Sequence, residues 1–430
     1  MTEYWCERYW QPGGVRDGVL VAVADDGTIK SLSTMDTAPE DAYRLSGLVF
    51  PGFANAHSHA FHRALRGRTH GAGGTFWSWR EHMYALARRL DPDTYLELAR
   101  AVYAEMAVAG ISCVGEFHYL HHAPGGARYN DPNAMGEALR QAASDAGIRL
   151  TLLDACYLAG GIGEPVTVAQ QRFSDGNVLG WAERVAALSG DENTVIGAAI
   201  HSVRAVPRAD LTAVAASEVR RPLHVHLSEQ PAENEACLAA YGRTPTQLLA
   251  ESGVLSARTT AVHATHVSTS DIALLGAVRA GVCLCPTTEA DLADGIGPAR
   301  ELNDAGCPLS LGSDQHAVVD PLAEARALEH GERLRSGRRG RFAPAELGIA
   351  LTSTGHRALG WSGTHADLVA VRTDSVRTAG CAPDQVLLAA TASDVHTVVV
   401  GGRVVATDGQ HEKLGDVGHL LAKAIGALWE

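Results

Sequence analysis

Eight short apolar runs alternate with helical sequence patterns through the middle of this chain. Strand and helix segments that follow one another in this order form parallel strands joined by crossover helices. Eight such units, with no glycine- and serine-rich linker to divide them, predict one closed (β/α)₈ barrel of the TIM type over residues 50–361. The runs end near His57, Glu116, Cys156, His201, His226, His263, Cys285 and Asp314.

Helix-start and helix-stop signals separate the apolar runs. Asp91 and Pro92 predict the start of one helix, because aspartate caps a first turn and proline fits its first position. An open, doubly wound sheet is the alternative fold, but no Gly-x-Gly-x-x-Gly motif follows the first strand. The expected helices cover residues 92–109, 132–146, 207–220, 231–252, 268–280 and 321–335.

Both ends of the chain carry strand and turn signals. Residues 18–23 form a β-branched run followed by Asp25-Asp26-Gly27, which is a hairpin signal. Residues 366–371 and 397–400 read as strands, and the second meets a Gly401-Gly402 turn. We therefore predict an α/β protein in which residues 1–49 and 362–430 together form a small β-sandwich domain beside the barrel.

Composition narrows the class of partner. The net charge of −13 disfavours nucleic acid and acidic membrane surfaces. The eight cysteines are scattered and form no Cys-x-x-Cys motif, which predicts free, mostly buried thiols and a cytoplasmic location. No apolar run reaches membrane-spanning length, and the first residues lack the pattern of a signal peptide.

Polar residues of metal-binding type stand at the ends of predicted strands 1, 5, 6 and 8. Two of them are histidines separated by one residue, so their side chains point the same way along a strand. Catalytic residues of a (β/α)₈ barrel gather at the carboxyl ends of its strands. Three imidazoles and a carboxylate suit Zn²⁺ or Fe²⁺ and leave room for a bound water. The residues are His57, His59, His226, Glu229, His263 and Asp314.

These motifs together resemble the amidohydrolase superfamily in its deaminase branch, over essentially the whole chain. The matching segments are Pro-Gly-Phe-x-Asn-x-His-x-His from Pro51, then His-x-x-Glu, a single His, and Gly-Ser-Asp. The resemblance implies that Asp314 accepts a proton from water, that Glu229 carries a proton to the leaving nitrogen, and that His263 polarises the electrophile. The implied metal ligands are His57, His59, His226 and Asp314.

The distribution of lysine bears on the number of metal ions. Members of this superfamily often bridge two metals with a carboxylated barrel lysine. The three lysines of this chain are Lys30, Lys413 and Lys423, so none lies between residues 31 and 412. A lysine-bridged pair is therefore excluded, and we expect one divalent metal ion, Zn²⁺ with Fe²⁺ as the alternative.

The loops after the predicted strands hold a second set of residues. Arg80 lies among aromatic residues and Arg204 follows a strand end, and planar guanidinium groups match carboxylates. The segments around them closely resemble the formimidoylglutamate deiminase family. That resemblance implies hydrolysis of N-formimidoyl-L-glutamate, a small dicarboxylate amidine, to N-formyl-L-glutamate and ammonia in histidine degradation. The implied substrate-binding residues are His62, Arg80, Tyr119, His201 and Arg204.

One position departs from that family, and several alternatives stay open. His62 stands where the family often has glutamine, and a histidine is expected to add pH dependence. Competing functions are deamination of a purine or similar ring, ring opening of imidazolonepropionate, and a non-catalytic structural barrel. A homodimer is an expectation from the superfamily only. His118, His121 and His122 are expected to be structural or exposed histidines.

Overall fold

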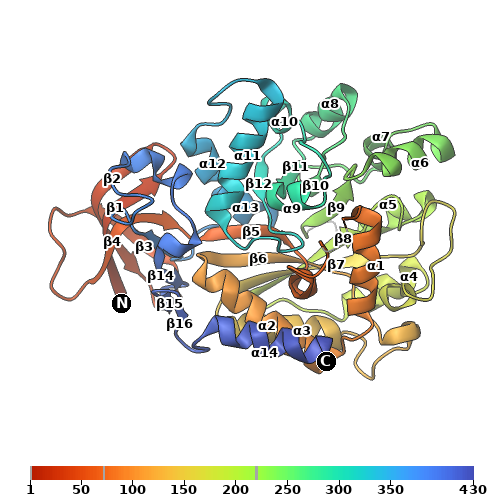
Figure 1. Cartoon of the computed structure of the whole chain (residues 1–430), viewed down its shortest axis with the longest axis horizontal. Coiled ribbons are helices and arrows are strands. Elements are labelled where there is room, and N and C mark those ends of the chain that lie inside the picture. The colour runs from red at the N-terminus through yellow and green to blue at the C-terminus, as the bar shows by residue number, and fades with distance from the viewer. Residues whose placement is uncertain (1, 71–72, 218–220) are drawn as a thin grey trace.

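Two eight-stranded sheets organise the molecule, which is a computed structural model describing residues 2–70, 73–217 and 221–430. One sheet is parallel throughout and runs in the order β12-β11-β10-β9-β8-β7-β6-β5. Its outer strands meet through a parallel bridge between Ser58 and Asp314. Helices surround this barrel, and the second sheet lies at one side of it (Figure 1). The predicted barrel is thereby confirmed.

Each predicted apolar run forms one strand of the barrel. Parallel strands buried on both faces read as continuous apolar runs, and this explains why the runs were visible in the sequence. The strands are β5 (Phe53–Ser58), β6 (Ile111–His118), β7 (Arg149–Cys156), β8 (Thr194–Ile200), β9 (Leu223–Leu227), β10 (Thr259–His263), β11 (Gly281–Leu284) and β12 (Leu309–Leu311).

The barrel closes where Gly312 lies against β5. A Cβ atom on Gly312 would stand 2.8 Å from the backbone oxygen of His57, so only glycine permits this approach. Just beyond, the Asp314 N–H donates to His57 O at 3.0 Å, and the His59 N–H donates to Asp314 O at 3.1 Å. The closure therefore fixes Asp314 beside His57 on β5 and His59 just past its end.

The predicted helices are present, with one error. Residues 231–252 are not a single helix: Gly242 adopts a left-handed φ of 63° and ends α6, and Thr244 caps α7. Residues 218–220 of the predicted 207–220 helix lie outside the described residues. The helices are α2 (Pro92–Val108), α3 (Ala134–Ala146), α5 (Arg208–Ser217), α6 (Pro231–Tyr241), α7 (Pro245–Glu251), α8 (Thr269–Ala277) and α11 (Pro321–Ser336).

Further helices complete the covering of the barrel. The last of them, α14, runs beside α2 (Figure 1), and its Trp429 Nε1 donates to Ala64 O at 3.1 Å. The others are shorter and lie in the connections. These helices are α1 (Phe76–Ala87), α4 (Val178–Ala186), α9 (Pro286–Asp291), α10 (Ala299–Asp304), α12 (Pro344–Leu351), α13 (Ser353–Ala358) and α14 (Val417–Trp429).

The second sheet is built from both ends of the chain, as predicted. Its order is β16-β15-β14-β13-β4-β1-β2-β3, and the pairing of β1 with β4 is parallel while the other pairs are antiparallel. One face encloses a small apolar core of its own. The strands are β1 (Thr2–Gln11), β2 (Gly14–Val23), β3 (Ile29–Thr34), β4 (Tyr43–Pro51), β13 (Leu368–Val371), β14 (Val395–Val400), β15 (Arg403–Thr407) and β16 (Gln410–His411).

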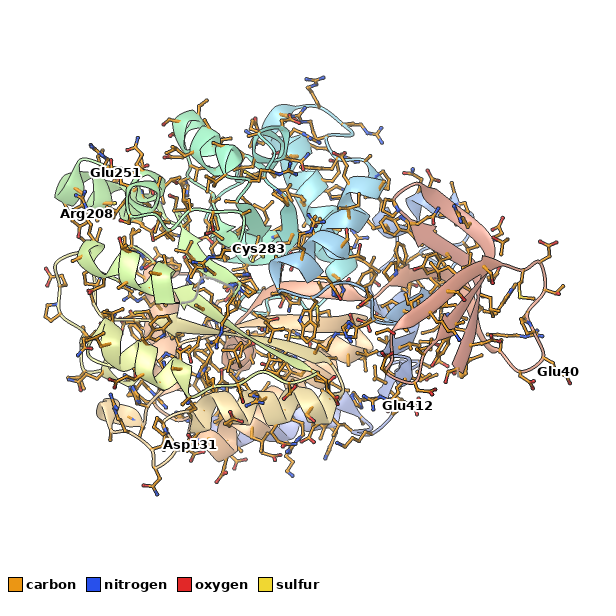
Figure 2. The ribbon with its side chains drawn as sticks, turned by 180° about the vertical axis from the view of Figure 1, so that it is seen from behind. Glu40, Asp131, Arg208, Glu251, Cys283 and Glu412 are labelled. Atoms are coloured by element: carbon orange, nitrogen blue, oxygen red, sulfur yellow. The ribbon has the colours of Figure 1, made fainter. Side chains whose placement is uncertain are left out.

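The cysteines are all free, and all but Cys381 are buried, as expected. Cys283, for example, lies among the barrel strands in the middle of the molecule, whereas Arg208 and Glu251 lie at its edge (Figure 2). Among the helices of the described residues, none combines the length and the apolar character that crossing a membrane requires.

A buried ion pair joins the barrel to the terminal sheet, and its loss is expected to destabilise the protein. Arg149 on β7 pairs with Asp367, and their side chains are 3% and 5% exposed. Arg149→Met leaves that carboxylate buried and without its charged partner, with a hydrogen bond from the Gly401 N–H, so the free energy of unfolding should fall by about 3–5 kcal/mol. Urea unfolding followed by circular dichroism measures this.

Arg372→Met is the matched control for that change. Its pair with Asp408 is 43% and 63% exposed, so the expected loss is under about 1 kcal/mol. Equal losses of unfolding free energy in the two variants would contradict the stabilising role assigned to the Arg149–Asp367 ion pair.

Candidate active site

The four predicted metal ligands lie near one another at the carboxyl ends of β5, β9 and β12. His57 Nε2 lies 3.1 Å from His226 Nε2 and 3.4 Å from Asp314 Oδ1. His59 Nε2 lies 3.4 Å from the same Asp314 oxygen. All four side chains are buried. Asp314 adopts a left-handed φ of 43°, a strained conformation of the kind that clusters at functional sites.

Backbone carbonyls set the tautomers of two of these histidines. His59 Nδ1 lies 2.9 Å from Phe117 O, and His226 Nδ1 lies 2.8 Å from His201 O. A carbonyl oxygen can only accept, so each Nδ1 carries the hydrogen and each neutral ring presents a lone pair at Nε2. Burial, reinforced by neighbouring imidazoles, holds the pKa of both rings and of His57 well below the usual value.

The donor set fits a divalent metal ion. Neutral imidazoles and a carboxylate are ligands for zinc and iron. In a tetrahedral zinc shell with bonds of about 2.0–2.1 Å, neighbouring ligand atoms are about 3.4 Å apart. Three of the pairs, His226 with His57 and Asp314 with each of His57 and His59, are 3.1 to 3.4 Å apart and agree with that spacing. Ligand atoms within 4.8 Å of one another form two overlapping groups, one of His57, His59 and Asp314 and one of His57, His226 and His263. Two lone pairs that face each other across such distances repel one another unless a cation lies between them.

Glu229 and His263 lie beside this cluster. His263 Nε2 is 3.7 Å from Glu229 Oε1 and 3.9 Å from Asp314 Oδ2, and its Nδ1 donates to Glu289 Oε1 at 3.3 Å. Burial alone would lower the pKa of His263, but the surrounding carboxylates raise it well above the usual value. Burial raises the pKa of Glu229 to about 7, although His263 opposes that shift. The group therefore holds one imidazolium and a glutamate able to exchange protons near neutral pH.

A cavity opens over the cluster. Its walls come from the loops after β5, β6, β7, β8 and β9 and from α1. All the residues expected to bind substrate line it: His62, Arg80, Tyr119, His201 and Arg204.

The two arginines present positive charge to the cavity in different ways. Arg204 Nε donates to Glu233 Oε2 at 2.8 Å, which holds its guanidinium in place. Arg80 Nε donates to Tyr84 Oη at 2.5 Å and lies over the rings of Trp77 and Tyr84. Within the described ranges, Arg80 has no carboxylate partner. Its charge is thus available to an anion.

The expected pH dependence of His62 is wrong. Burial lowers the pKa of His62 to about 3, so the ring is neutral throughout the physiological range. Its Nε2 lies 2.9 Å from Tyr119 Oη, which places this pair in the cavity wall as a hydrogen-bonded unit. The sequence could not show that the imidazole is buried.

Other polar residues of these loops have structural roles. Arg63 and Arg66 both bind Glu105, at 2.7 and 2.8 Å, away from the cavity lining. His121 Nε2 donates to Ala155 O at 2.9 Å. The grouping of His118 and His121 with Asp154 has the spacing of metal ligands, but Arg184 and Trp181 already donate to both oxygens of Asp154. The structural expectation for these histidines therefore agrees with their contacts.

Several residues at the site were not anticipated. Tyr157 lines the cavity from the loop after β7, and Gln170 contacts it from behind. Glu289, on the short helix after β11, receives the His263 hydrogen bond. No motif marks these positions. Only the aromatic neighbourhood of Trp79 and Tyr84, in the run that contains Arg80, carried a signal in the sequence.

Comparison with known proteins agrees with this geometry. Residues 48–405 match the description "Amidohydrolase family". The chain belongs to the amidohydrolase family. The predicted resemblance to formimidoylglutamate deiminase is also confirmed: the enzyme of that name from Pseudomonas aeruginosa is 36% identical over 435 residues, covering 96% of each protein.

Other relatives include deaminases of ring compounds. The 8-oxoguanine deaminase of Pseudomonas aeruginosa is 30% identical over 435 residues, covering 93% of this chain and 92% of that protein. A crystal structure described as an amidohydrolase from Brucella melitensis superposes with a TM-score of 0.93 at 32% identity, covering 100% of both chains. A zinc-bound adenosine deaminase from Xanthomonas campestris shares the fold, with a TM-score of 0.84 at 21% identity, covering 98% and 96%. This protein is therefore a hydrolase of C–N bonds and a deaminase of a metal-dependent family.

Proposed function

We propose that this protein hydrolyses N-formimidoyl-L-glutamate to N-formyl-L-glutamate and ammonia. The observation that carries the proposal is the polarity of the cavity. Its lining includes the carboxyl groups of Glu229 and Asp314 together with the guanidinium groups of Arg80 and Arg204. A substrate with a basic amidine at one end and two carboxylates at the other matches that arrangement.

The proposed cofactor is one zinc ion held by the four converging ligands. The chemistry that the ion supplies when bound is the ionisation of a water molecule near neutral pH. The barrel has no lysine that could be carboxylated to bridge a second ion. We assign the ligands as His57, His59, His226 and Asp314.

The remaining side chains perform the proton transfers. Asp314 accepts a proton from the attacking water, and Glu229 delivers a proton to the nitrogen that leaves as ammonia. The C=N bond of the formimidoyl group is replaced by a C=O bond, and the bond from that carbon to the α-nitrogen of glutamate stays intact. His263, charged and facing both carboxylates, stabilises the negative charge that develops during addition.

The biological setting belongs to the same proposal. A role in histidine degradation, a cytoplasmic location and a homodimer are supported by the resemblance to the formimidoylglutamate deiminase family and its superfamily. The partner is a small dicarboxylate amidine, with no role for nucleic acid or membrane.

Ammonia release from the zinc-loaded protein tests the proposal. We expect turnover of N-formimidoyl-L-glutamate and none of 8-oxoguanine, guanine or adenosine. A ring deaminase is the second candidate, favoured by the 30% identical relative that acts on 8-oxoguanine and by the aromatic residues of the cavity wall. Ammonia from a purine but not from the amidine would select that candidate instead.

Removal of Arg204 is expected to weaken substrate binding. Arg204→Met deletes charge-assisted hydrogen bonds to a carboxylate, each contributing about 1.5–3 kcal/mol, so kcat/KM should fall about 100-fold or more, mainly through KM. Steady-state kinetics measure this, and the zinc content should stay unchanged.

Arg208→Met is the matched control, because Arg208 lies four positions further on and pairs at 3.4 Å with Glu251 at the molecular surface (Figure 2). Its kinetics should match the wild type. Loss of zinc from Arg204→Met, or an unchanged KM, would show that the assignment of Arg204 to the substrate is wrong.

A further inference from the structure

Gln170 lies behind the cavity wall and contacts two tyrosines that line it. Gln170 is 1% exposed and lies just before the 3₁₀ turn Gln171–Phe173. Gln170 Nε2 is 2.8 Å from Tyr157 Oη and 3.1 Å from Tyr84 Oη. Tyr84 belongs to α1 and Tyr157 to the loop after β7, and both are part of the cavity lining. Three separate segments therefore meet at this amide.

The backbone determines which way the amide of Gln170 points. The Thr167 N–H donates to Gln170 Oε1 at 2.9 Å, and the Thr167 hydroxyl donates to the same oxygen at 2.8 Å. A backbone N–H has no lone pair, so the atom facing it must be the amide oxygen. The NH₂ group of Gln170 therefore faces the two tyrosines.

This orientation controls the hydroxyl protons of both tyrosines. An amide NH₂ donates and cannot accept, so neither hydroxyl can give its proton to Gln170. Tyr84 Oη also receives a hydrogen bond from Arg80 Nε at 2.5 Å, and that group cannot accept either. The part of the chain that the structure describes offers no other acceptor within hydrogen-bonding distance of either hydroxyl. Each proton is thus left to point into the cavity.

We propose that Gln170 is a positioning residue that makes this part of the cavity a carboxylate-binding subsite, with the hydroxyls of Tyr84 and Tyr157 as donors beside the guanidinium of Arg80. Two hydroxyl donors and a positive charge match a carboxylate, which only accepts hydrogen bonds. A ligand group that presents N–H donors would instead face the hydrogen-bond donors of this subsite and would bind poorly. The naming of the ligand as a substrate carboxylate rests on the proposed function, whereas the preference for an anion rests on the hydrogen bonds themselves.

The test uses glutarate, a five-carbon dicarboxylate, as a probe that needs no turnover. Its Kd for the zinc-loaded protein is measured by calorimetry at fixed ionic strength, together with KM and kcat for N-formimidoyl-L-glutamate. Gln170→Glu keeps the shape and the acceptor for Thr167 but places a second carboxylate oxygen against the tyrosines, which then donate to it. Two hydrogen bonds to a charged ligand are lost, so the Kd and KM should rise about 100-fold while kcat changes little.

A double-mutant cycle separates orientation from a merely structural role. Gln170→Met should raise the glutarate Kd about 10-fold in the wild type. The same change should add little in the Tyr84→Phe/Tyr157→Phe background, because the hydroxyls through which Gln170 acts are gone. Thermal unfolding of each variant checks folding. Should Gln170→Glu not fold, the Tyr84→Phe/Tyr157→Phe variant decides, since an unchanged glutarate Kd there overturns the proposal.

The two proposals can fail separately. If the wild type releases no ammonia from the amidine but binds glutarate, and Gln170→Glu loses that binding, the proposed function is wrong and the subsite stands. If the wild type turns over the amidine while Gln170→Glu leaves KM and the glutarate Kd unchanged, the subsite is wrong and the proposed function stands. No glutarate binding by the wild type also overturns the subsite.

Discussion

Asp314→Asn is expected to lower kcat/KM by about 1,000-fold or more while the protein still folds. Asp314 lies within 3.4 Å of both His57 and His59, and its second oxygen faces His263 at 3.9 Å. An asparagine of the same shape cannot accept the proton of water, and its amide is a weaker metal ligand. Both losses act at the transition state, so the effect should appear in kcat.

Zinc content distinguishes the two roles of Asp314. A variant that retains zinc and has lost turnover has lost the proton acceptor, whereas a variant without zinc has lost a ligand. Asp408→Asn, which changes a 63% exposed carboxylate in the terminal sheet, is the control and should keep full activity. Turnover by Asp314→Asn within 10-fold of the wild type would contradict both roles.

The fold was readable from the sequence because its strands are short, buried on both faces and separated by capped helices. Asp91 shows how local these signals are: its side chain accepts from Thr94 N–H at 2.8 Å, as an N-cap should. The break between α6 and α7 was missed although Gly242 and Thr244 mark it, because the apolar pattern continues across both helices. The spacing of apolar residues does not reveal where a residue adopts a left-handed φ.

The candidate ligands were predictable for a different reason. In a barrel, residues that end strands 1, 5 and 8 must meet, so residue type and strand position together locate His57, His226 and Asp314. Gln170 could not be found in this way, because its contacts join segments 86 and 13 residues away through loops without periodicity. The neutral state of His62 could not be predicted from the sequence either, because it depends on burial, which is a property of the fold.

The charges of the cavity explain how one site can bind an amidine and also transfer protons. Burial raises the pKa of Asp294, next to the catalytic carboxyl groups, to about 8, and it raises that of Glu229 to about 7. The buried acidic groups therefore hold protons at neutral pH instead of all being ionised. In the same cavity, burial alone would lower the pKa of Arg204, but Glu233 raises it, so this guanidinium stays charged. Different side chains of one cavity therefore orient the substrate and supply protons.

Glu229→Gln is expected to lower kcat by about 100- to 10,000-fold, the range that a positioned general acid contributes. Glutamine has the same size and can still accept a hydrogen bond, but it carries no transferable proton at any pH. Because the pKa of Glu229 is about 7 and the acid acts when protonated, wild-type kcat/KM should decline as pH rises above about 7. Stopped-time ammonia assays from about pH 5 to about pH 9, on both sides of the pKa of about 7, measure both effects.

Glu324→Gln is a closely matched control for that variant. Glu324 is also a buried glutamate whose pKa is raised by burial, to about 8, but it binds Thr287 and lies outside the cavity lining. Its substitution should leave kcat and the pH profile unchanged. Glu229→Gln should bind zinc as the wild type does, because Glu229 is not one of the proposed ligands and its closest ion-pair contact is His263. A Glu229→Gln variant with wild-type kcat would remove Glu229 from the proton path and leave His263 as the nearest group able to protonate the leaving nitrogen.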